Sequence, residues 1–420
     1  MLNLSANFIK YFKKILFPFY KNKELKFVFK KLHQDYPEEK IVARFVGGCV
    51  RKYLTGDKID DIDIATILTS DEIKLKFKNT NFKAIDTGIN HGTITLVSKN
   101  FKLELTTLRK DSKTDGRHAE VEYIDDWKID SERRDFTINA IYLDIKGKIF
   151  DPQKGTIDLK NKNVKFIGNP QKRIEEDYLR IIRFIRFSIM YNNVVDQTAI
   201  DAIKLNINGI KKISKERILI ELFKILDLKN FFILNNNNYL KEIFYLIFPE
   251  IIYLNRLNRL NQIYEYSKIN RDILLAVLLI DEKNNHEYFS HKYNISNEIK
   301  NNLDLLAKGL NLLKENKFIF DKNLEKEIYL NGKNHLIALN ILSFASNPKY
   351  NLASFSKTLK KILESKIHKF SIDGRYLMNN GMKEGVSLGK VLKLIEEEWI
   401  NNNFKISKDR ILELIKLNLN

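Results

Sequence analysis

The spacing of apolar residues changes near residue 170, and this change constrains the fold more than any other feature of the sequence. From residue 41 to residue 151, short segments with strand-like alternation are separated by clusters of Gly, Asp and Thr. After about residue 170, Gly and Pro become scarce and Leu, Ile and Phe recur every three or four residues, which is the period of a helix. We therefore predict an α+β chain with an α/β head and an all-helical second part.

The individual elements follow from the same spacing. Strands are expected at 41–46, 61–66, 93–97, 103–108, 136–144 and 148–151, with a helix at 50–54. Helices of the second part are expected at 177–191, 215–228, 301–313 and 388–400. Residues 1–20 place apolar side chains on one helical face with lysines between them, which favours a docking helix over a targeting signal.

Composition narrows the class of partner. The formal net charge is +19, from 72 Lys and Arg against 53 Asp and Glu. Such a surplus attracts polyanions and indicates nucleic acid, although a drift toward Lys, Asn and Ile explains the charge equally well. Cys49 is the only cysteine, which excludes an internal disulfide and is typical of a reducing compartment. The sequence contains neither an apolar stretch long enough to span a membrane nor histidines with zinc-site spacing.

Two aspartates carry the strongest chemical signal. Asp61 and Asp63 flank Ile62 in an expected strand, where side chains two residues apart point to the same face. Their mutual repulsion favours a cation between them, and hard carboxylate oxygens favour Mg²⁺. Glu104, the one acid of a neighbouring apolar strand, is placed to be the third carboxylate of a two-metal site. A solvated strand end explains each of these acids equally well when it is taken alone.

A glycine pair precedes this signal. Gly47 and Gly48 stand between an expected strand and an expected helix, where backbone N–H groups can approach a triphosphate and the helix dipole favours an anion. Arg51, one turn into the helix, can add charge-assisted hydrogen bonds. A tight turn alone would also explain the two glycines.

Four motifs in the same order resemble those of the class II tRNA nucleotidyltransferases, a family that contains CCA-adding enzymes and bacterial poly(A) polymerases. They are Gly47-Gly48-Cys49-Val50-Arg51, Asp61-Ile62-Asp63-Ile64-Ala65-Thr66, Arg133-Arg134-Asp135-Phe136-Thr137-Ile138-Asn139-Ala140 and Glu176-Asp177-Tyr178-Leu179-Arg180. The resemblance is dense over residues 41–190 and returns weakly at residues 374–399. The sequence departs from the family at three positions. Lys52 stands where Asp is usual, Tyr178 where Pro or Ala is usual, and Val386 where Pro is usual.

The resemblance implies a role for each matching residue. Asp61 and Asp63 would be the metal ligands and Glu104 the third active-site carboxylate. Gly48 and Arg51 would contact the nucleotide, whereas Arg134 and Asp135 would serve the nucleotide and its ribose, with Asn139 in the same loop.

Asp177 and Arg180 are expected to share a helix face, which Arg183 and Arg186 extend. An Asp accepts from the amino group of cytosine or adenine, and an Arg donates to the ring acceptor beside it. Guanine and uracil present a carbonyl instead, so they meet the Asp acceptor against acceptor. These side chains would thereby select C and A without a template, although an ordinary helix ion pair is the simpler reading.

The implied activity is template-independent addition of C, C and A to the 3′ end of tRNA from CTP and ATP, with release of pyrophosphate. Poly(A) polymerase is the nearest alternative, but residues 86–93 resemble the CCA-adding form. Residues 111–117 resemble the flexible loop that CC-adding members lack, whereas an A-adding enzyme stays open. An inactive RNA-binding relative and a small-molecule nucleotidyltransferase are the alternatives of other classes.

We divide the chain into an N-terminal amphipathic helix (1–24), a nucleotidyltransferase head (25–165), a helical neck for base recognition (166–230) and a helical body and tail for tRNA binding (231–420). The tRNA acceptor and T arm would be held by contacts to phosphate and shape. A cytoplasmic location is expected, with organelle targeting by the first helix as the alternative. No obligate protein partner is inferred.

Overall fold

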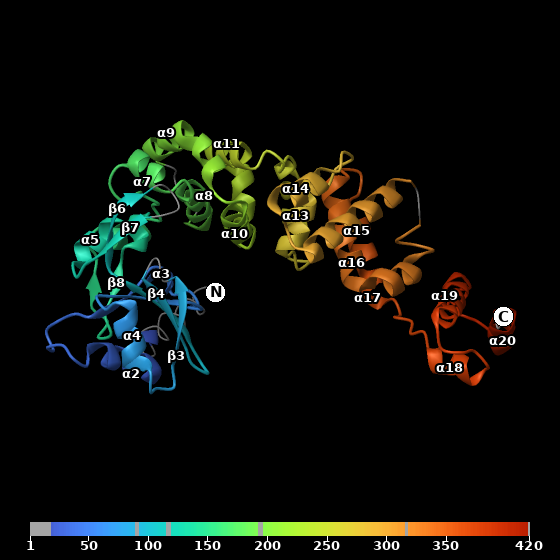
Figure 1. The fold of residues 1–420 in the computed structure, drawn as a ribbon. Coiled ribbons are helices and arrows are strands. Elements are labelled where there is room, and N and C mark those ends of the chain that lie inside the picture. Colours follow the sequence, from blue (N-terminus) through green and yellow to red (C-terminus); the bar gives the residue numbers. More distant parts are fainter. Residues whose placement is uncertain (1–17, 89–91, 115–118, 192–195, 316–317, 419–420) are drawn as a thin grey trace, which may run out of the picture. The chain divides into compact units, whose positions relative to one another are not determined.

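The computed structural model describes residues 18–88, 92–114, 119–191, 196–315 and 318–418. The chain divides into two compact units, with the boundary in the sequence between Pro249 and Glu250 (Figure 1). Most of the predicted N-terminal helix, residues 1–17, lies outside the described residues. The domain boundaries drawn at residues 165 and 230 stay predictions.

The first unit is built on a mixed sheet with the strand order β3-β4-β5-β2-β1-β8-β9. Within this sheet β2 and β5 run parallel, and the other pairs of neighbouring strands are antiparallel. The strands are β1 (Ala43–Val46), β2 (Ile62–Thr66), β3 (Lys83–Gly88), β4 (Thr93–Val97), β5 (Lys102–Thr107), β8 (Tyr142–Leu143) and β9 (Ile149–Phe150). A separate two-stranded sheet pairs β6 (Arg109–Thr114) with β7 (Ala119–Tyr123).

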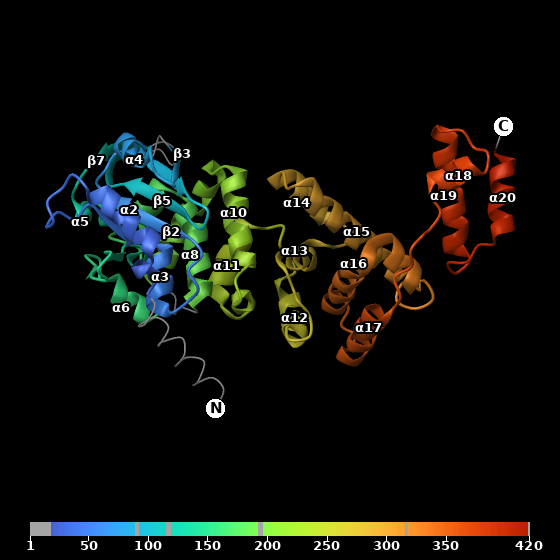
Figure 2. The same cartoon turned by 90° about the horizontal axis from the view of Figure 1, so that it is seen from below.

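The two faces of this sheet differ in chemistry. Phe45, Ile64 and Leu105 are register partners on β1, β2 and β5 and are fully buried, and the Phe45 ring contacts Phe29 of α2 (Lys23–His33) at 4.6 Å. Helices α3 (Gly48–Thr55) and α4 (Ser70–Phe77) complete the helical layer beside α2 (Figures 1 and 2). Since side chains alternate along a strand, the residues next to these point to the opposite face.

Short helices and a helical layer complete the first unit. α5 (Trp127–Glu132) and α6 (Gly155–Lys160) belong to the head, and α7 (Pro170–Glu176), α8 (Leu179–Tyr191), α9 (Gln197–Asn206), α10 (Lys215–Leu226) and α11 (Asn238–Ile247) follow. Phe184 and Phe187 of α8 contact the Phe136 ring of the head at 6.2 and 5.5 Å. This aromatic packing holds α8 against the residues that precede β8.

The second unit is entirely helical in its described residues. It contains α12 (Leu257–Ile263), α13 (Arg271–Leu279), α14 (Asn285–Tyr293), α15 (Asn297–Lys314), α16 (Leu324–Ser346), α17 (Leu352–Glu364), α18 (Gly374–Asn379), α19 (Val386–Asn401) and α20 (Lys408–Leu417). The last three helices share a core that includes Leu377, Ile395 and Leu414. The predicted fold class, an α/β head followed by helices, is therefore confirmed. Among the described helices, none combines the length and apolarity that crossing a membrane requires.

Three local predictions were wrong. The strand expected at 136–144 is reduced to β8, because Thr137–Asn139 form a 3-10 turn. Every residue from 136 to 143 is buried, so no alternation separates the turn from the strand. The prediction of a loop at 111–117 was wrong for Asp111–Thr114, because these residues belong to strand β6. Residues 115–117 lie outside the described residues. The helix expected from Asp177 begins at Leu179.

Candidate active site

Two of the three predicted carboxylates lie side by side. Asp63 on β2 is the register partner of Glu104 on the parallel strand β5, and both side chains line a hollow of about 420 Å³. Its other lining residues are Val46, Ile64, Thr93, Thr106, Arg109, Arg133 and Arg134. Asp61 is exposed and lies one residue before β2. Within the described residues, no group of three or more His, Cys, Asp and Glu side chains is arranged to hold a metal ion.

Arginines line the hollow, but the described residues make no direct ion pair with its two carboxylates. Burial raises the pKa of Asp63, and the charges of Glu104 and Asp61 raise it further against the opposing effects of Arg134 and Arg51. The nearby cations pair elsewhere: Lys52 with Asp60, and Arg134 with Asp130. Thus no described Lys, Arg or His forms an ion pair with the three predicted carboxylates.

The glycine pair lies directly over this site. Gly47 has φ +72°, a conformation that side chains rarely adopt, and a Cβ there would lie 3.3 Å from Asp63 Oδ2. Gly48 begins α3 and has open space where a Cβ would be. No side chain caps this helix start. The turn therefore leaves backbone N–H groups and open space close to the carboxylates.

A buried carboxylate that sequence reasoning missed holds two of the three arginines that line the hollow. Asp130, fully buried on α5, accepts from Arg133 Nη2 at 2.7 Å, Arg134 Nη2 at 3.0 Å and the Tyr142 hydroxyl at 2.7 Å. Burial alone would raise the pKa of Asp130, but the two guanidinium groups outweigh it and lower the pKa to about 2. A single Asp before an Arg pair looks in sequence like an exposed helix ion pair, which is why its role was not predicted.

The loop after Arg134 forms a second buried network. Asp135 accepts from Arg183 Nη2 at 2.6 Å and from Asn139 Nδ2 at 2.7 Å, while Asn139 Oδ1 accepts from Arg51 Nη1. Burial would raise the pKa of Asp135, but Arg183 and the hydrogen bond from Asn139 lower it to about 2. Arg51 also donates to the Tyr191 hydroxyl at 3.2 Å. Four predicted nucleotide-binding residues are thus brought into one network.

The Phe187 ring offsets the repulsion between three arginines that lie beside this network. The guanidinium carbons of Arg51, Arg183 and Arg186 lie 4.8, 5.6 and 4.3 Å from the centre of its ring. The ring faces attract cations, and buried Glu221 accepts from Arg186 Nε at 2.8 Å. Neither Phe187 nor Glu221 was predicted, since both look like ordinary core-facing helix positions.

Asp177 and Arg180 do not share one helix face, so this prediction was wrong. Asp177 has extended backbone (φ −155°, ψ 105°) between α7 and α8, where its Oδ1 accepts from Leu179 N at 3.1 Å. Its Oδ2 accepts from Arg217 Nη2 at 2.8 Å. Arg180 donates to Glu176 Oε2, to the Arg173 carbonyl and to the Arg133 carbonyl at 2.6, 2.9 and 3.0 Å. The helix break presents the two side chains from the same junction instead.

Tyr178 at this junction packs on a residue that has no side chain. A Cβ on Gly209 would lie 2.0 Å from the Tyr178 ring, and Lys212 Nζ lies 5.5 Å from the ring centre. The departure from the family at Tyr178 is therefore accommodated by a glycine in the 3-10 helix Ile207–Lys212, which follows α9.

Comparison with known proteins agrees with this arrangement. The sequence profile of the poly A polymerase head domain matches residues 43–165. The chain is 32% identical over 406 residues to human mitochondrial CCA tRNA nucleotidyltransferase 1, which covers 92% of this chain and 89% of the relative. It is 31% identical over 387 residues to the CCA-adding enzyme of Staphylococcus haemolyticus, which covers 90% of this chain and 94% of the relative. The solved Bacillus stearothermophilus CCA-adding enzyme in complex with CTP has the same fold, with a TM-score of 0.68, 24% identity, and coverage of 93% of this chain and 96% of that one.

Proposed function

Because this chain belongs to the CCA-adding tRNA nucleotidyltransferase family, we propose that the hollow around Asp63 and Glu104 is the site where it adds nucleotides. The protein adds C, C and A to the 3′ end of tRNA from CTP and ATP. The observation that carries the site is the register pairing of Asp63 with Glu104 beneath the Gly47 turn.

We assign Mg²⁺ to Asp61 and Asp63, with Glu104 as the third carboxylate. The residues fit a divalent cation: two carboxylates line one hollow, no described cation pairs with them, and burial together with the charge of Glu104 raises the pKa of Asp63. When bound there, Mg²⁺ would supply charge for activating the 3′ hydroxyl of the RNA and for stabilising the leaving pyrophosphate. The chain itself contributes the carboxylate ligands and the wall of the hollow behind them.

The residues around the carboxylates bind the nucleotide. The uncapped start of α3 at Gly48 offers N–H groups to the triphosphate, and Arg134 adds positive charge at the wall of the hollow. We assign the network of Asp135, Asn139 and Arg51 to the ribose. Hydrogen bonds to the 2′-hydroxyl, which deoxynucleotides lack, would select ribonucleotides.

Base selection is assigned to the junction between α7 and α8. Asp177 accepts a hydrogen bond from the amino group of cytosine or adenine, and Arg180 donates a hydrogen bond to the neighbouring acceptor atom of the base ring. Of the five N–H groups of Arg180, three are used by Glu176 and two backbone carbonyls, which leaves two for a base. On α8, Arg183 forms an ion pair with Asp135 and Arg186 forms one with Glu221, which hold these two carboxylates in place.

The remaining assignments concern the chain outside this site. We place base recognition in the helices of residues 166–230 and tRNA binding in the helices from residue 231 to the end, through phosphate and shape. A cytoplasmic location is proposed, supported by a single, buried cysteine that fits a reducing compartment.

The test is incorporation of labelled CTP and ATP into three tRNA transcripts that end before CCA, after C and after CC, with Mg²⁺ present. Ordered addition of C, C and A followed by a stop is expected from the wild-type protein, with no use of UTP or GTP. The Asp63→Asn variant serves as the inactive control. Long A tails would instead indicate a poly(A) polymerase, and action on the CC-ending transcript alone would indicate an A-adding enzyme.

A further inference from the structure

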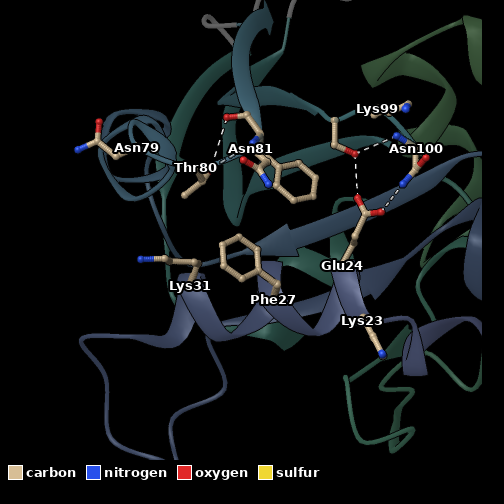
Figure 3. Close-up of a pocket in the computed structure, with 11 residues that line it drawn as sticks. Lys23, Glu24, Phe27, Lys31, Asn79, Thr80, Asn81, Lys99 and Asn100 are labelled. Atoms are coloured by element: carbon tan, nitrogen blue, oxygen red, sulfur yellow. Dashed lines mark hydrogen bonds between the residues drawn. The ribbon is translucent and has the colours of Figure 1, made fainter.

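A second concave site lies on the helical side of the head sheet. It is a groove of about 740 Å³ between α2 and two loops, the turn at 79–82 and the β4–β5 turn at 98–100 (Figure 3). It shares no lining residue with the hollow around Asp63 and Glu104. It is therefore a separate site from the hollow around the carboxylates.

The groove carries positive charge that is free to act on a ligand. Lys23, Lys31 and Lys99 line it, and Glu24 is its one acid. Glu24 is occupied: it accepts from Ser98 Oγ at 3.0 Å and from Asn100 Nδ2 at 2.6 Å, contacts that Figure 3 shows crossing from α2 to the β4–β5 turn. Glu24 thus joins α2 to the β4–β5 turn, and with one acid against three lysines the lining of the groove keeps a net positive charge.

An aromatic platform forms the floor of the same groove. The Phe27 side chain is 39% exposed, and its ring lies nearly parallel to that of buried Phe82, with 11° between the planes and 6.3 Å between the centres. An exposed ring backed by a second ring offers a flat apolar face. Such a face suits the stacking of a nucleobase, which every base provides.

Exposed amides line the same groove as the platform. Asn79 and Asn81 are exposed on the turn that precedes β3, and Thr80 of this turn accepts from Phe82 N at 3.2 Å and donates to the Phe77 carbonyl at 3.0 Å. These bonds set the turn before any ligand arrives. Amide groups both donate and accept hydrogen bonds, so they suit the polar edges of bases.

We propose that this groove binds single-stranded RNA, with a base stacked on Phe27 and the adjoining phosphates held by Lys23 and Lys99. The combination of a cationic groove, a stacking ring and amides is the chemistry of single-strand binding without sequence preference. A purely anionic ligand would leave the ring unused, and an apolar peptide would leave the lysines unused. The assignment does not depend on where CCA addition occurs.

The experiment measures binding of full-length protein to a single-stranded RNA of about eight nucleotides. The strand carries 4-thiouridine for crosslinking and a 3′ phosphate that prevents extension. Crosslinks are expected in the peptides that contain Phe27 and Lys99. Phe27→Ala should weaken binding at the groove about tenfold, the loss of one stacked base.

The double variant Lys23→Ala, Lys99→Ala provides a test that does not disturb packing, since both side chains are exposed. It should lower the salt dependence of binding, the slope of log K against log salt, by about 1.4. Lys146→Ala, Lys160→Ala removes the same charge from exposed positions outside the groove and serves as the matched control. All variants should retain wild-type kcat for CTP incorporation at saturating tRNA, so failure of the groove is distinguished from failure of the active site.

Three results would overturn the proposal. Crosslinks and affinity that stay unchanged in both groove variants would exclude RNA from the groove. Displacement of the RNA by inorganic polyphosphate as readily as by RNA would show attraction to charge alone, without a stacked base. Displacement by AMP at the same concentration as RNA would assign the groove to free nucleotides and overturn binding of a strand.

Discussion

Replacing Asp130 by Asn tests how the arginines of the active site are held in place. The carboxylate is fully buried and is the acceptor for Arg133, Arg134 and the Tyr142 hydroxyl. A carboxyl whose pKa falls from 3.8 to about 2 on folding stabilises the protein by about 2.5 kcal/mol at neutral pH. This contribution is complete above the unfolded pKa and is lost as the pH falls through the folded pKa. Because Asn also leaves two guanidinium groups without their counter-charge, we expect a loss of about 3 kcal/mol.

The assay combines unfolding with steady-state kinetics. Denaturant unfolding should show the lower free energy of unfolding, and the KM for CTP and ATP should rise about tenfold as the arginines of the hollow lose their anchor. Glu250→Gln is the control, since it removes a buried carboxylate that pairs with Lys292 in the second unit and should leave both KM values unchanged. A variant with wild-type stability, or one that is less stable but has unchanged KM values, would refute the argument that Asp130 positions the arginines.

Three further predictions concern the same site. Folding raises the pKa of Asp63, so the ionised carboxylate destabilises the fold at neutral pH and protonation removes this effect below the folded pKa. Asp63→Asn should therefore raise the melting temperature measured without Mg²⁺, abolish nucleotide incorporation and lose the stabilisation by Mg²⁺ that the wild type should show. A lower melting temperature would contradict this. Gly47→Ala should cost about 1–3 kcal/mol in denaturant unfolding because of its positive φ, and its Cβ near Asp63 should lower incorporation; wild-type stability would exclude strain at this turn. Arg217→Ala should lower the preference for CTP over UTP by up to about fivefold through loss of its partly exposed contact with Asp177, measured by competitive incorporation, and unchanged selectivity would exclude that support.

The part of the site that depends on local periodicity was predictable. Glu104 lies in a short strand with alternating burial, and Asp63 is the one residue of β2 that is only partly buried. A strand period of two places such acids on one face. Their pairing across parallel β2 and β5 needed only the assumption that the strands are neighbours. The helical second part was predictable for the same reason, since its apolar spacing repeats over many turns.

What could not be predicted depends on contacts between distant segments or on backbone breaks. Asp130 and Glu221 are indistinguishable in sequence from exposed acids on amphipathic helices, and only tertiary packing buries them. The break before Leu179 interrupts a segment with continuous helical spacing, so the relation between Asp177 and Arg180 was misjudged. The strand β6 is almost wholly polar and shows no alternation that could mark it.

Tyr178 and Gly209 can change only in one order over the history of this chain. While the tyrosine is present, any side chain at position 209 would begin 2.0 Å from its ring, so the glycine is locked in. A smaller residue at position 178 must come first, and only then does position 209 become free to vary. Once a side chain has been acquired there, return to tyrosine is blocked in turn. The steric contact therefore makes substitution at position 209 depend on what residue stands at position 178.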